Sequence, residues 1–263
     1  MKTAILGGKG YIGSFFHKTN YNIDVFDRAK IGTFFDNIDR YDSIVHLADT
    51  RLDNYTEEHK TYYKSLNSKI VSSINNKTFL LFLSSCSVYG IGENITEWSE
   101  TKPTSLYSES KLMSEKILQE HPNTLIFRMG TVFGPSPNLR KDLLINNLTT
   151  SILSNKSVDI FSPEDYRPFL YIKDVYNNIF YALDNRERFS GSLINLVSFN
   201  ISKFDLVREI VKNLGSASIR YSMEKEKSTR NYIVSNTYSL DMGFKYNYTL
   251  ETAMSDFVNA LSS

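Results

Sequence analysis

A glycine-rich stretch close to the N-terminus, ILGGKGYIGS, is the feature that most restricts the fold of this chain. It places Gly7, Gly10 and Gly13 at regular intervals between an apolar run of strand length and a stretch with helical character. Glycine is needed where a chain turns tightly and where its backbone must approach a pyrophosphate closely. A following helix would direct unpaired N–H groups and its positive dipole end at the phosphates. The pattern predicts a dinucleotide-binding loop, and the alternative is a glycine-rich turn that only ends a strand.

An acidic residue at the end of the second apolar run favours the dinucleotide-binding loop. Asp27 lies 20 residues after Gly7, where a carboxylate would accept hydrogen bonds from the adenosine ribose. Its negative charge would repel the 2′-phosphate of NADP, whereas Arg28 and Lys30 could each pair with that phosphate. The sequence therefore favours NAD as the cofactor and leaves NADP open.

Short apolar runs alternate with helical stretches in the first half of the chain. Most of the runs lack alternation between polar and apolar residues, as is typical of strands buried on both faces of a parallel sheet. The predicted strands cover residues 4–6, 23–26, 44–47, 79–83 and 125–128. The predicted helices cover residues 11–18, 55–74 and 105–120. This βαβ order predicts an α/β protein with a Rossmann-like, doubly wound parallel sheet.

The second half of the chain has a less regular order. Further predicted elements are helices at 139–153, 172–183, 203–213 and 250–261, a strand at 193–196 and a loop at 222–230. We interpret residues 1–160 as the dinucleotide-binding domain, to which residues 171–200 return. Residues 161–263 mainly form a smaller, partly interleaved C-terminal cap that binds the substrate.

Composition excludes several other classes of protein. A net charge of +1 provides no basic surface for nucleic acid, and a hydrophobic fraction of 41% excludes a disordered chain. The single cysteine, Cys86, suits a reducing compartment, and none of the four histidines has the spacing of metal ligands. The N-terminus lacks signal-peptide features, and no apolar stretch approaches the ~18 residues that span a membrane. We expect a cytoplasmic protein without a metal site or a membrane partner.

Small hydroxyl residues follow the fourth predicted strand, in the stretch SSCSVYG. Ligands of open α/β sheets bind at the carboxyl ends of strands, so Ser84, Ser85 and Ser87 are placed to meet a substrate. Tyr107 comes 22 residues after Ser85, and Lys111 lies one helical turn further along, on the same helix face. Tyr107 and Lys111 either form a proton-transfer pair or belong to a solvated helix face.

An exposed Tyr–Lys pair could not by itself form an acid–base catalyst. Lowering a tyrosine pKa from ~10 to ~7 takes about 4 kcal/mol, at about 1.36 kcal/mol per pH unit. An exposed pair on a helix contributes only ~0.2–0.5 kcal/mol. Lys111 can therefore activate Tyr107 only in a desolvated cleft and beside a second positive charge, which an oxidised nicotinamide would supply.

The chain as a whole resembles the extended short-chain dehydrogenases/reductases, in the nucleotide-sugar epimerase and dehydratase family that includes UDP-glucose 4-epimerase. The matching segments occur in family order over nearly the whole chain: GGKGYIG at 7–13, VHLA at 45–48, SSCSVYG at 84–90, YSESK at 107–111, FRMGTVFGP at 127–135 and RPFLYIKDV at 167–175. The resemblance implies an NAD(P)-dependent enzyme of carbohydrate biosynthesis that acts on a nucleotide-sugar and forms a homodimer.

The same resemblance implies roles for individual residues. Tyr107 would be the general acid/base, Lys111 its activator and the anchor of the cofactor ribose, and Ser85 the hydroxyl on the reacting oxygen. The implied cofactor-binding residues are Gly7, Gly10, Tyr11, Ile12, Gly13, Asp27, Arg28, Leu47, Ala48, Asn67 and Lys111. For Asn67 the alternative is a polar residue on a solvated helix face.

Substrate contacts are implied for four further residues: Ser87, Thr131, Arg167 and Arg230. The two arginines fall where family members bind the substrate's diphosphate, and a guanidinium group matches phosphate oxygens two at a time. A solvated loop arginine is the alternative for Arg230. Arg128, at the end of a predicted strand, either forms a structural ion pair or contacts the ligand.

Departures from the family pattern bear on the activity. Residues 27–44 form a short segment that lacks the strand whose acidic end usually meets adenine. Thr131 stands where many members have Asn, and Pro168 where Asp is common. SSCSVYG lacks the Thr-Asp-Glu of the 4,6-dehydratases and so the acid–base pair for the C5 proton and the C6 hydroxyl. We expect a C4 epimerase that works through a transient keto-sugar; the alternatives are an NAD(P)H-dependent 4-keto-sugar reductase and a non-catalytic dinucleotide sensor.

Overall fold

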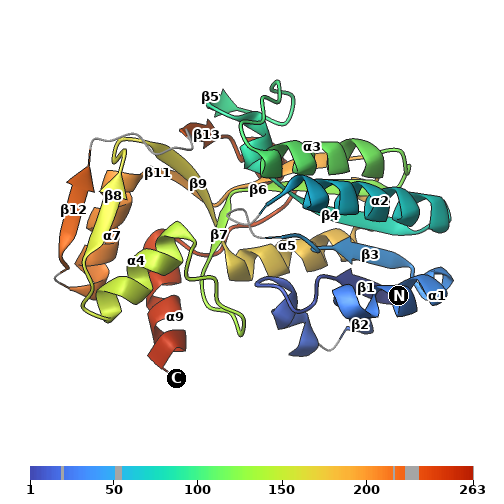
Figure 1. Ribbon diagram of the computed structural model, residues 1–263, viewed down its shortest axis with the longest axis horizontal. Helices are drawn as coiled ribbons and strands as arrows, with labels where there is room; N and C mark the ends of the chain where they lie inside the picture. The colour runs from blue at the N-terminus through green and yellow to red at the C-terminus, as the bar shows by residue number, and fades with distance from the viewer. Residues whose placement is uncertain (19–20, 51–54, 216, 223–230, 263) are drawn as a thin grey trace.

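The central element of the computed structural model, which describes residues 1–18, 21–50, 55–215, 217–222 and 231–262, is a six-stranded parallel sheet (Figure 1). Its strand order is β10-β6-β4-β3-β1-β2. The strands are β1 (Thr3–Leu6), β2 (Ile23–Phe26), β3 (Ser43–His46), β4 (Phe79–Ser85), β6 (Thr124–Met129) and β10 (Leu193–Leu196). The strand order reverses between β1 and β3, which is where ligands bind in doubly wound sheets. The predicted fold class is confirmed.

Helices cover both faces of this sheet (Figure 1). One face carries α1 (Ile31–Asp36), α2 (Glu57–Ser73) and α3 (Leu106–Leu118), and the other carries η1 (Gly13–Lys18) and α5 (Ile172–Asp184). In β1, Ala4 and Leu6 join the hydrophobic cluster under α2, whereas Ile5 between them joins the cluster under α5. Successive side chains of a strand point to opposite faces, so a strand covered on both sides is apolar throughout.

Most of the remaining elements form smaller sheets and helices at the end of the molecule away from the N-terminus (Figure 1), whereas α6 lies near that terminus, where Arg186 donates to the sulfur of Met1. The small sheets pair β11 (Phe199–Ser202) with β9 (Tyr166–Tyr171) and β7 (Thr131–Phe133), β12 (Ile219–Ser222) with β8 (Val158–Phe161), and β13 (Tyr232–Val234) with β5 (Gly92–Ile95). The other helices are α4 (Leu144–Leu153), α6 (Arg186–Phe189), α7 (Lys203–Leu214), α8 (Thr237–Asp241) and α9 (Leu250–Ser262). Between β9 and β11 the chain returns to the central sheet as α5 and β10; the proposed domain boundaries remain a prediction.

The predicted helix at residues 11–18 is wrong in kind. The chain forms a 3₁₀ helix, η1, only from Gly13 to Lys18. Its rings Phe15 and Phe16 pack on Tyr176 of α5, with ring centroids 4.5 and 5.2 Å apart. Short 3₁₀ pieces make poorer hydrogen bonds than an α-helix, and packing on α5 stabilises this one. A six-residue 3₁₀ helix does not supply the α-helix dipole that the sequence predicted for the phosphates.

The segment after β2 contains only helical turns: η2 (Arg28–Lys30), α1 and η3 (Ile38–Arg40). The predicted lack of a further strand between residues 27 and 42 is therefore confirmed. The helix predicted at 139–153 begins later, at Leu144. Of the predicted loop 222–230, Ser222 ends β12 and the rest lies outside the described residues.

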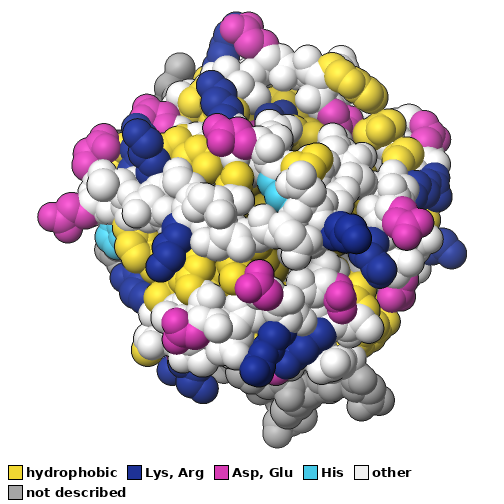
Figure 2. All heavy atoms as spheres, turned by 90° about the vertical axis from the view of Figure 1, so that its right-hand side faces the viewer, with side chains coloured by type: hydrophobic (Ala, Val, Ile, Leu, Met, Phe, Trp, Pro, Cys, Tyr) yellow, Lys and Arg dark blue, Asp and Glu magenta, His cyan; other side chains and the backbone are white. Residues whose placement is uncertain are grey.

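In the described part of the chain, no helix is both long and apolar enough to cross a bilayer. On the face shown in Figure 2, Lys and Arg side chains are interspersed with Asp and Glu, which agrees with the net charge of +1.

Candidate active site

The glycine loop folds against the ends of three neighbouring strands. The N–H groups of Gly7 and Gly8 both donate to the carbonyl of Phe26, at 2.8 and 2.9 Å. Gly7 has a φ of +95°, and a Cβ at this position would lie 2.7 Å from the backbone nitrogen of Ala48. At Gly13 a Cβ would lie 2.2 Å from the carbonyl oxygen of Gly7. The backbone geometry thus requires glycine at both positions.

Alanine at position 7 is expected to weaken dinucleotide binding. Gly7→Ala places a side chain in left-handed backbone and against Ala48, and strain of about 1–3 kcal/mol corresponds to a loss of affinity of about 5- to 150-fold. Calorimetric titration with NAD measures the change. Gly32→Ala is the matched control, because no atom lies within 4 Å of that Cβ, and NAD affinity should stay unchanged. Equal affinities of wild type and Gly7→Ala would contradict the role of the loop.

A pocket of about 410 Å³ opens beside the glycine loop. This volume lies within the range of ~300–1,000 Å³ that is usual for small-molecule sites. The lining residues are Leu6, Gly7, Lys9, Gly10, Phe26, Asp27, Arg28, Ala29, Ile31, Leu47, Ala48, Asp49, Tyr62, Tyr63 and Leu66. Glycine backbone without Cβ atoms lines part of the pocket, and a carboxylate lies at one end. This arrangement fits a dinucleotide.

Asp27 lies at one end of this pocket, directly after β2. Its carboxylate pairs with Lys9 at 2.5 Å and accepts a hydrogen bond from the backbone N–H of Lys30 at 3.1 Å. The hydrogen bond from Lys9 is the main cause that holds the pKa of Asp27 below its ordinary value. The guanidinium group of Arg28 lies over the ring of Tyr62, 4.8 Å from its centroid. Residues of η2 and α2 form this side of the pocket, where other doubly wound sheets have a further strand.

Two predicted cofactor residues of the loop direct their side chains away from the pocket. The Tyr11 hydroxyl donates to the carbonyl of Gly134 at 2.7 Å and accepts from Asn146 at 3.1 Å. Burial raises its pKa far above the ordinary tyrosine value, so the hydroxyl is neutral. Ile12 accepts a hydrogen bond from Tyr176 through its carbonyl, at 2.6 Å. These bonds attach the loop to the segment before α4 and to α5, and any contact of Tyr11 with a cofactor would come from its backbone.

The three serines at the end of β4 have different environments. Ser84 is buried and donates to Glu115, so the prediction that it faces a substrate is wrong. Ser85 is half-buried, donates to the hydroxyl of Ser87 at 2.9 Å and lies close enough to Tyr107 to lower the pKa of its hydroxyl slightly. Because successive residues of a strand point to opposite faces, Ser84 and Ser85 cannot both face the same cleft.

Tyr107 lies in the first turn of α3, where Ser105 and Ser108 form a capping box. Its half-buried ring meets Tyr55 edge-on, with centroids 5.5 Å apart. Burial raises the pKa of Tyr107 well above the ordinary value, and the negative charge of Asp49 adds to the rise. Without a cofactor, the hydroxyl is therefore protonated.

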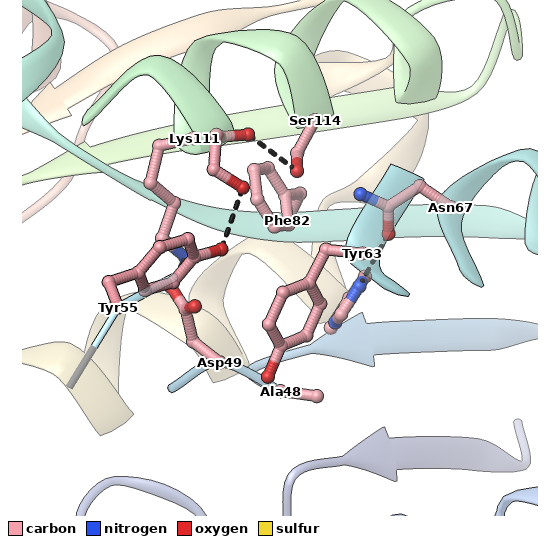
Figure 3. A pocket seen from close by; sticks show the side chains of 10 residues that line it. Ala48, Asp49, Tyr55, Tyr63, Asn67, Phe82, Lys111 and Ser114 are labelled. Atoms are coloured by element: carbon pink, nitrogen blue, oxygen red, sulfur yellow. Dashed lines mark hydrogen bonds and ion pairs between the residues drawn. The ribbon is translucent and has the colours of Figure 1, made fainter. Parts of the chain in front are cut away.

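Lys111 extends from α3 to the carboxyl ends of the strands (Figure 3). Its ammonium group donates to the carbonyl of Leu83 at 2.7 Å and pairs with the carboxylate of Asp49 at 2.6 Å. It lies 5.9 Å from the centroid of the Tyr107 ring. Thus the structure brings Ser85, Tyr107 and Lys111 together, and Asp49, the partner of Lys111, also lines the glycine-loop pocket.

Comparison with known proteins identifies the family. The sequence profile of the NAD dependent epimerase/dehydratase family matches residues 16–197, which is more than half of the chain. This chain belongs to the NAD dependent epimerase/dehydratase family. The resemblance inferred from its motifs is confirmed.

Three solved structures of this type share the fold over the whole chain. MoeE5 in complex with UDP-glucose and NAD has 19% identity and a TM-score of 0.85, covering 100% of this chain and 99% of its own. The UDP-glucuronic acid 4-epimerase from Bacillus cereus, in complex with UDP-glucuronic acid and NAD, has 19% identity and a TM-score of 0.84, with the same coverage. TunA, an NAD-dependent NDP-hexosamine 5,6-dehydratase, has 18% identity and a TM-score of 0.85, covering 99% and 97%. At these identities the likeness shows the fold alone.

Asn67, which family resemblance places near the cofactor, is fully buried in α2. Its side-chain oxygen bonds to Nε2 of His46 at 2.8 Å, so the alternative of a solvated helix face is wrong. Burial lowers the pKa of His46 to about 4, which makes the imidazole neutral at neutral pH. The two side chains border a small cavity that also contacts Lys111 (Figure 3).

Arg128 forms a structural ion pair rather than a ligand contact. Its guanidinium group binds both carboxylate oxygens of Glu115 at 2.6–3.2 Å, and both side chains are buried. The ring of Tyr89 lies on the other side, 4.7 Å from the guanidinium carbon. The pair joins α3 to β6 directly behind the cluster of Ser85 and Tyr107.

The residues predicted to bind the family's nucleotide-sugar are less closely grouped. Ser87 lies next to Ser85, as described above. Thr131 is half-buried at the start of β7, and Arg167 is buried in β9. Neither lines the 410 Å³ pocket. Arg230 lies outside the described residues, so substrate binding by these residues remains a prediction.

Sequence reasoning missed three residues of this site: Lys9, Asp49 and Tyr55. Asp49 follows VHLA at the carboxyl end of β3, so the rule that singled out Asp27 after β2 would also have found it. Lys9 lies inside the glycine motif, where its charge could have been weighed against Asp27. No sequence pattern indicated Tyr55, because its contact joins the segment before α2 to Tyr107 in α3.

Proposed function

We propose that this chain is an NAD-dependent nucleotide-sugar epimerase that acts at C4 through a transient keto-sugar. The observation that carries the proposal is the grouping of Ser85, Tyr107 and Lys111, with Lys111 paired to Asp49, which lines the glycine-loop pocket. Membership of the family supports a nucleotide-sugar substrate. UDP-sugars are the first class to test, because the fold relatives MoeE5 and the Bacillus cereus epimerase were solved with them.

Each residue of the cluster has a distinct task in this proposal. Tyr107 takes the proton from the C4 hydroxyl and returns it, while Ser85 holds the reacting oxygen by a hydrogen bond. Lys111 and Asp27 hold the two ribose groups of the dinucleotide. NAD supplies the hydride acceptor and donor when it is bound. Arg167 and Arg230 would bind the diphosphate of the sugar nucleotide. The keto-sugar could then rotate and present its other face to the cofactor without leaving the site.

Dehydration is disfavoured by the residues beside Ser85. A 4,6-dehydratase needs an acid–base pair next to the catalytic hydroxyl, and this chain has Cys86 and Ser87 there. The thiol of Cys86 is fully buried and donates to the carbonyl of Arg128 at 3.2 Å. Burial raises the pKa of this thiol, so it is neutral and cannot serve as the base.

A 4-keto-sugar reductase is the second candidate. It would use Ser85 and Tyr107 once, in the reducing direction, and would consume NAD(P)H. Positive charges near Asp27 favour it, since Lys9 pairs with that carboxylate at 2.5 Å and Arg28 follows it in the chain. Both cations line the pocket where the 2′-phosphate of NADP would lie.

Native mass spectrometry of the purified protein, followed by assays with UDP-, GDP-, dTDP- and CDP-sugars, separates these functions. An epimerase is expected to retain NAD through purification and to interconvert C4 epimers without net change in absorbance at 340 nm. Stoichiometric consumption of NADPH with a 4-keto-sugar would replace the proposal by the reductase. Dinucleotide binding without turnover of any sugar nucleotide would indicate a sensor.

The homodimer implied by the resemblance and the cytoplasmic location predicted from composition remain predictions. Light scattering coupled to size-exclusion chromatography measures the mass in solution, and a value near twice the 30.2 kDa of the chain is expected.

A further inference from the structure

Asp49 occupies the junction between two spaces in the site. It follows β3 and lines the 410 Å³ pocket beside the glycine loop. It also lines the small cavity of about 10 Å³ that Lys111 borders. In Figure 3, Asp49 lies at the end of the Lys111 side chain, with Tyr55 beside them and Asn67 on the opposite side of the cavity. Asp27 lines the same large pocket after β2, where the adenosine ribose is expected, so Asp49 lies on the way to the reacting end.

The carboxylate of Asp49 neutralises Lys111. Its Oδ2 lies 2.6 Å from the ammonium nitrogen, and the two side chains are only 19% and 8% exposed. Its Oδ1 accepts the backbone N–H of Thr50 at 2.8 Å, and Lys111 also donates to the carbonyl of Leu83. These bonds hold both groups in place. The charge on Lys111 is therefore balanced before it can act on Tyr107.

We propose that Asp49 is a positioning residue, the fixed counter-ion of Lys111, and that it makes ionisation of Tyr107 depend on the positive charge of an oxidised nicotinamide. The part of the proposal that concerns the nicotinamide rests on the proposed function. The part that concerns Asp49, Lys111 and Tyr107 rests on the contacts of the protein itself.

The balance of charges gives the reason. The negative charge of Asp49 balances the positive charge of Lys111. In the same way, the positive charge of an oxidised nicotinamide would balance the negative charge of an ionised Tyr107. If the sugar alcohol became a ketone, Tyr107 would take the proton and bound NAD would take the hydride, so both groups would become neutral. The site then carries no net charge in either state. Without Asp49 it would carry one uncompensated positive charge in both, which is costly in a partly desolvated cleft.

Charged and polar groups from several elements lie near Tyr107 or act on its charge through space. Those described are Asp49 after β3, Tyr55 before α2, Ser85 in β4, Arg140 before α4, Tyr232 in β13 and Lys111 on its own helix. Arg140, which lowers the pKa of Tyr107, is itself paired with Asp142. Asp49 raises that pKa after the larger effect of burial. Removing the Asp49 charge is thus expected to ease ionisation of Tyr107 in the cofactor-free protein.

The first test measures the ionisation of the Tyr107 hydroxyl in the protein without cofactor. Carbon-13 NMR of labelled tyrosine rings follows ionisation, and the Tyr107→Phe variant identifies the signal. Wild-type Tyr107 should remain protonated beyond pH 10, and Asp49→Asn should lower its titration midpoint by about 1 pH unit or more. Asp49→Glu, which keeps the charge, should titrate like the wild type. An unchanged midpoint in Asp49→Asn would overturn the proposal.

The second test compares the affinities for NAD⁺ and NADH by calorimetry. Asp49→Asn leaves the charge of Lys111 unbalanced beside the cationic ring of NAD⁺. The variant should therefore lower the affinity for NAD⁺ relative to that for NADH by about tenfold or more. Asp27→Asn, an identical change at the adenosine end of the pocket, should alter both affinities by the same factor. Equal changes for both cofactors in Asp49→Asn would also overturn the proposal. If the wild type binds neither cofactor, the proposed function fails, whereas the titration of Tyr107 still decides the role of Asp49.

Discussion

Tyr107→Phe is expected to lower kcat for the sugar nucleotide by about 10²–10⁴-fold, the usual contribution of a general acid/base. The variant loses only the hydroxyl that lies near Ser85, and its ring can keep the edge contact with Tyr55. Affinity for NAD should therefore change little. Steady-state assays with the substrate found in the panel of sugar nucleotides, together with NAD titration, measure both quantities.

Tyr55→Phe is the matched control for this prediction. The Tyr55 hydroxyl bonds Ser110 at 2.7 Å rather than Ser85, although its ring touches Tyr107. We expect this variant to keep kcat within about tenfold of the wild type, because it removes no group from the proton path. Full turnover by Tyr107→Phe, or equal losses in both variants, would refute the assignment of Tyr107 as the acid/base.

Glu115→Gln is expected to destabilise the protein by about 3–5 kcal/mol, the usual result of removing one partner from a buried ion pair. The substitution leaves the guanidinium group of Arg128 without a counter-charge between β6 and α3. It also disturbs the hydrogen bond from Ser84. Urea unfolding followed by circular dichroism measures the free energy of unfolding.

The exposed pair of Arg220 and Asp159 provides the control. It has similar two-pronged geometry, at 2.6 and 3.1 Å, but both side chains are largely exposed. Asp159→Asn should therefore change the free energy of unfolding by no more than about 1 kcal/mol. A Glu115→Gln variant that is equally mild would mean that the buried pair does not support the site.

Local patterns predicted the strands of the central sheet well, because most of these strands are short apolar runs. The runs at 23–26 and 193–196 match β2 and β10 residue for residue. The stretch at 11–18 failed because its helical pattern is too short to specify an α-helix, and the final winding depends on packing against α5. The start of α4 at Leu144 likewise depends on hydrogen bonds of the Asn146 side chain with Gly134 and Arg140, which no local sequence pattern predicts.

In the site, sequence spacing predicted the members of the cluster but not the directions of all their side chains. Three serines at one strand end looked equivalent, and pleating assigned Ser84 to the buried Glu115 and Ser85 to Tyr107. Asn67 had two interpretations that burial alone separated. These choices depend on which elements cover each face of the sheet.

The sequence by itself determined the glycine loop, the parallel sheet and the family, since each follows from residues close together in the chain or from motifs in a characteristic order. It also placed Lys111 one helical turn from Tyr107. Only the tertiary structure decided where the Lys111 ammonium goes, because its partners, the carbonyl of Leu83 and the carboxylate of Asp49, come from two other strand ends. Charge balance in a partly buried site depends on such distant neighbours, which helix spacing does not reveal.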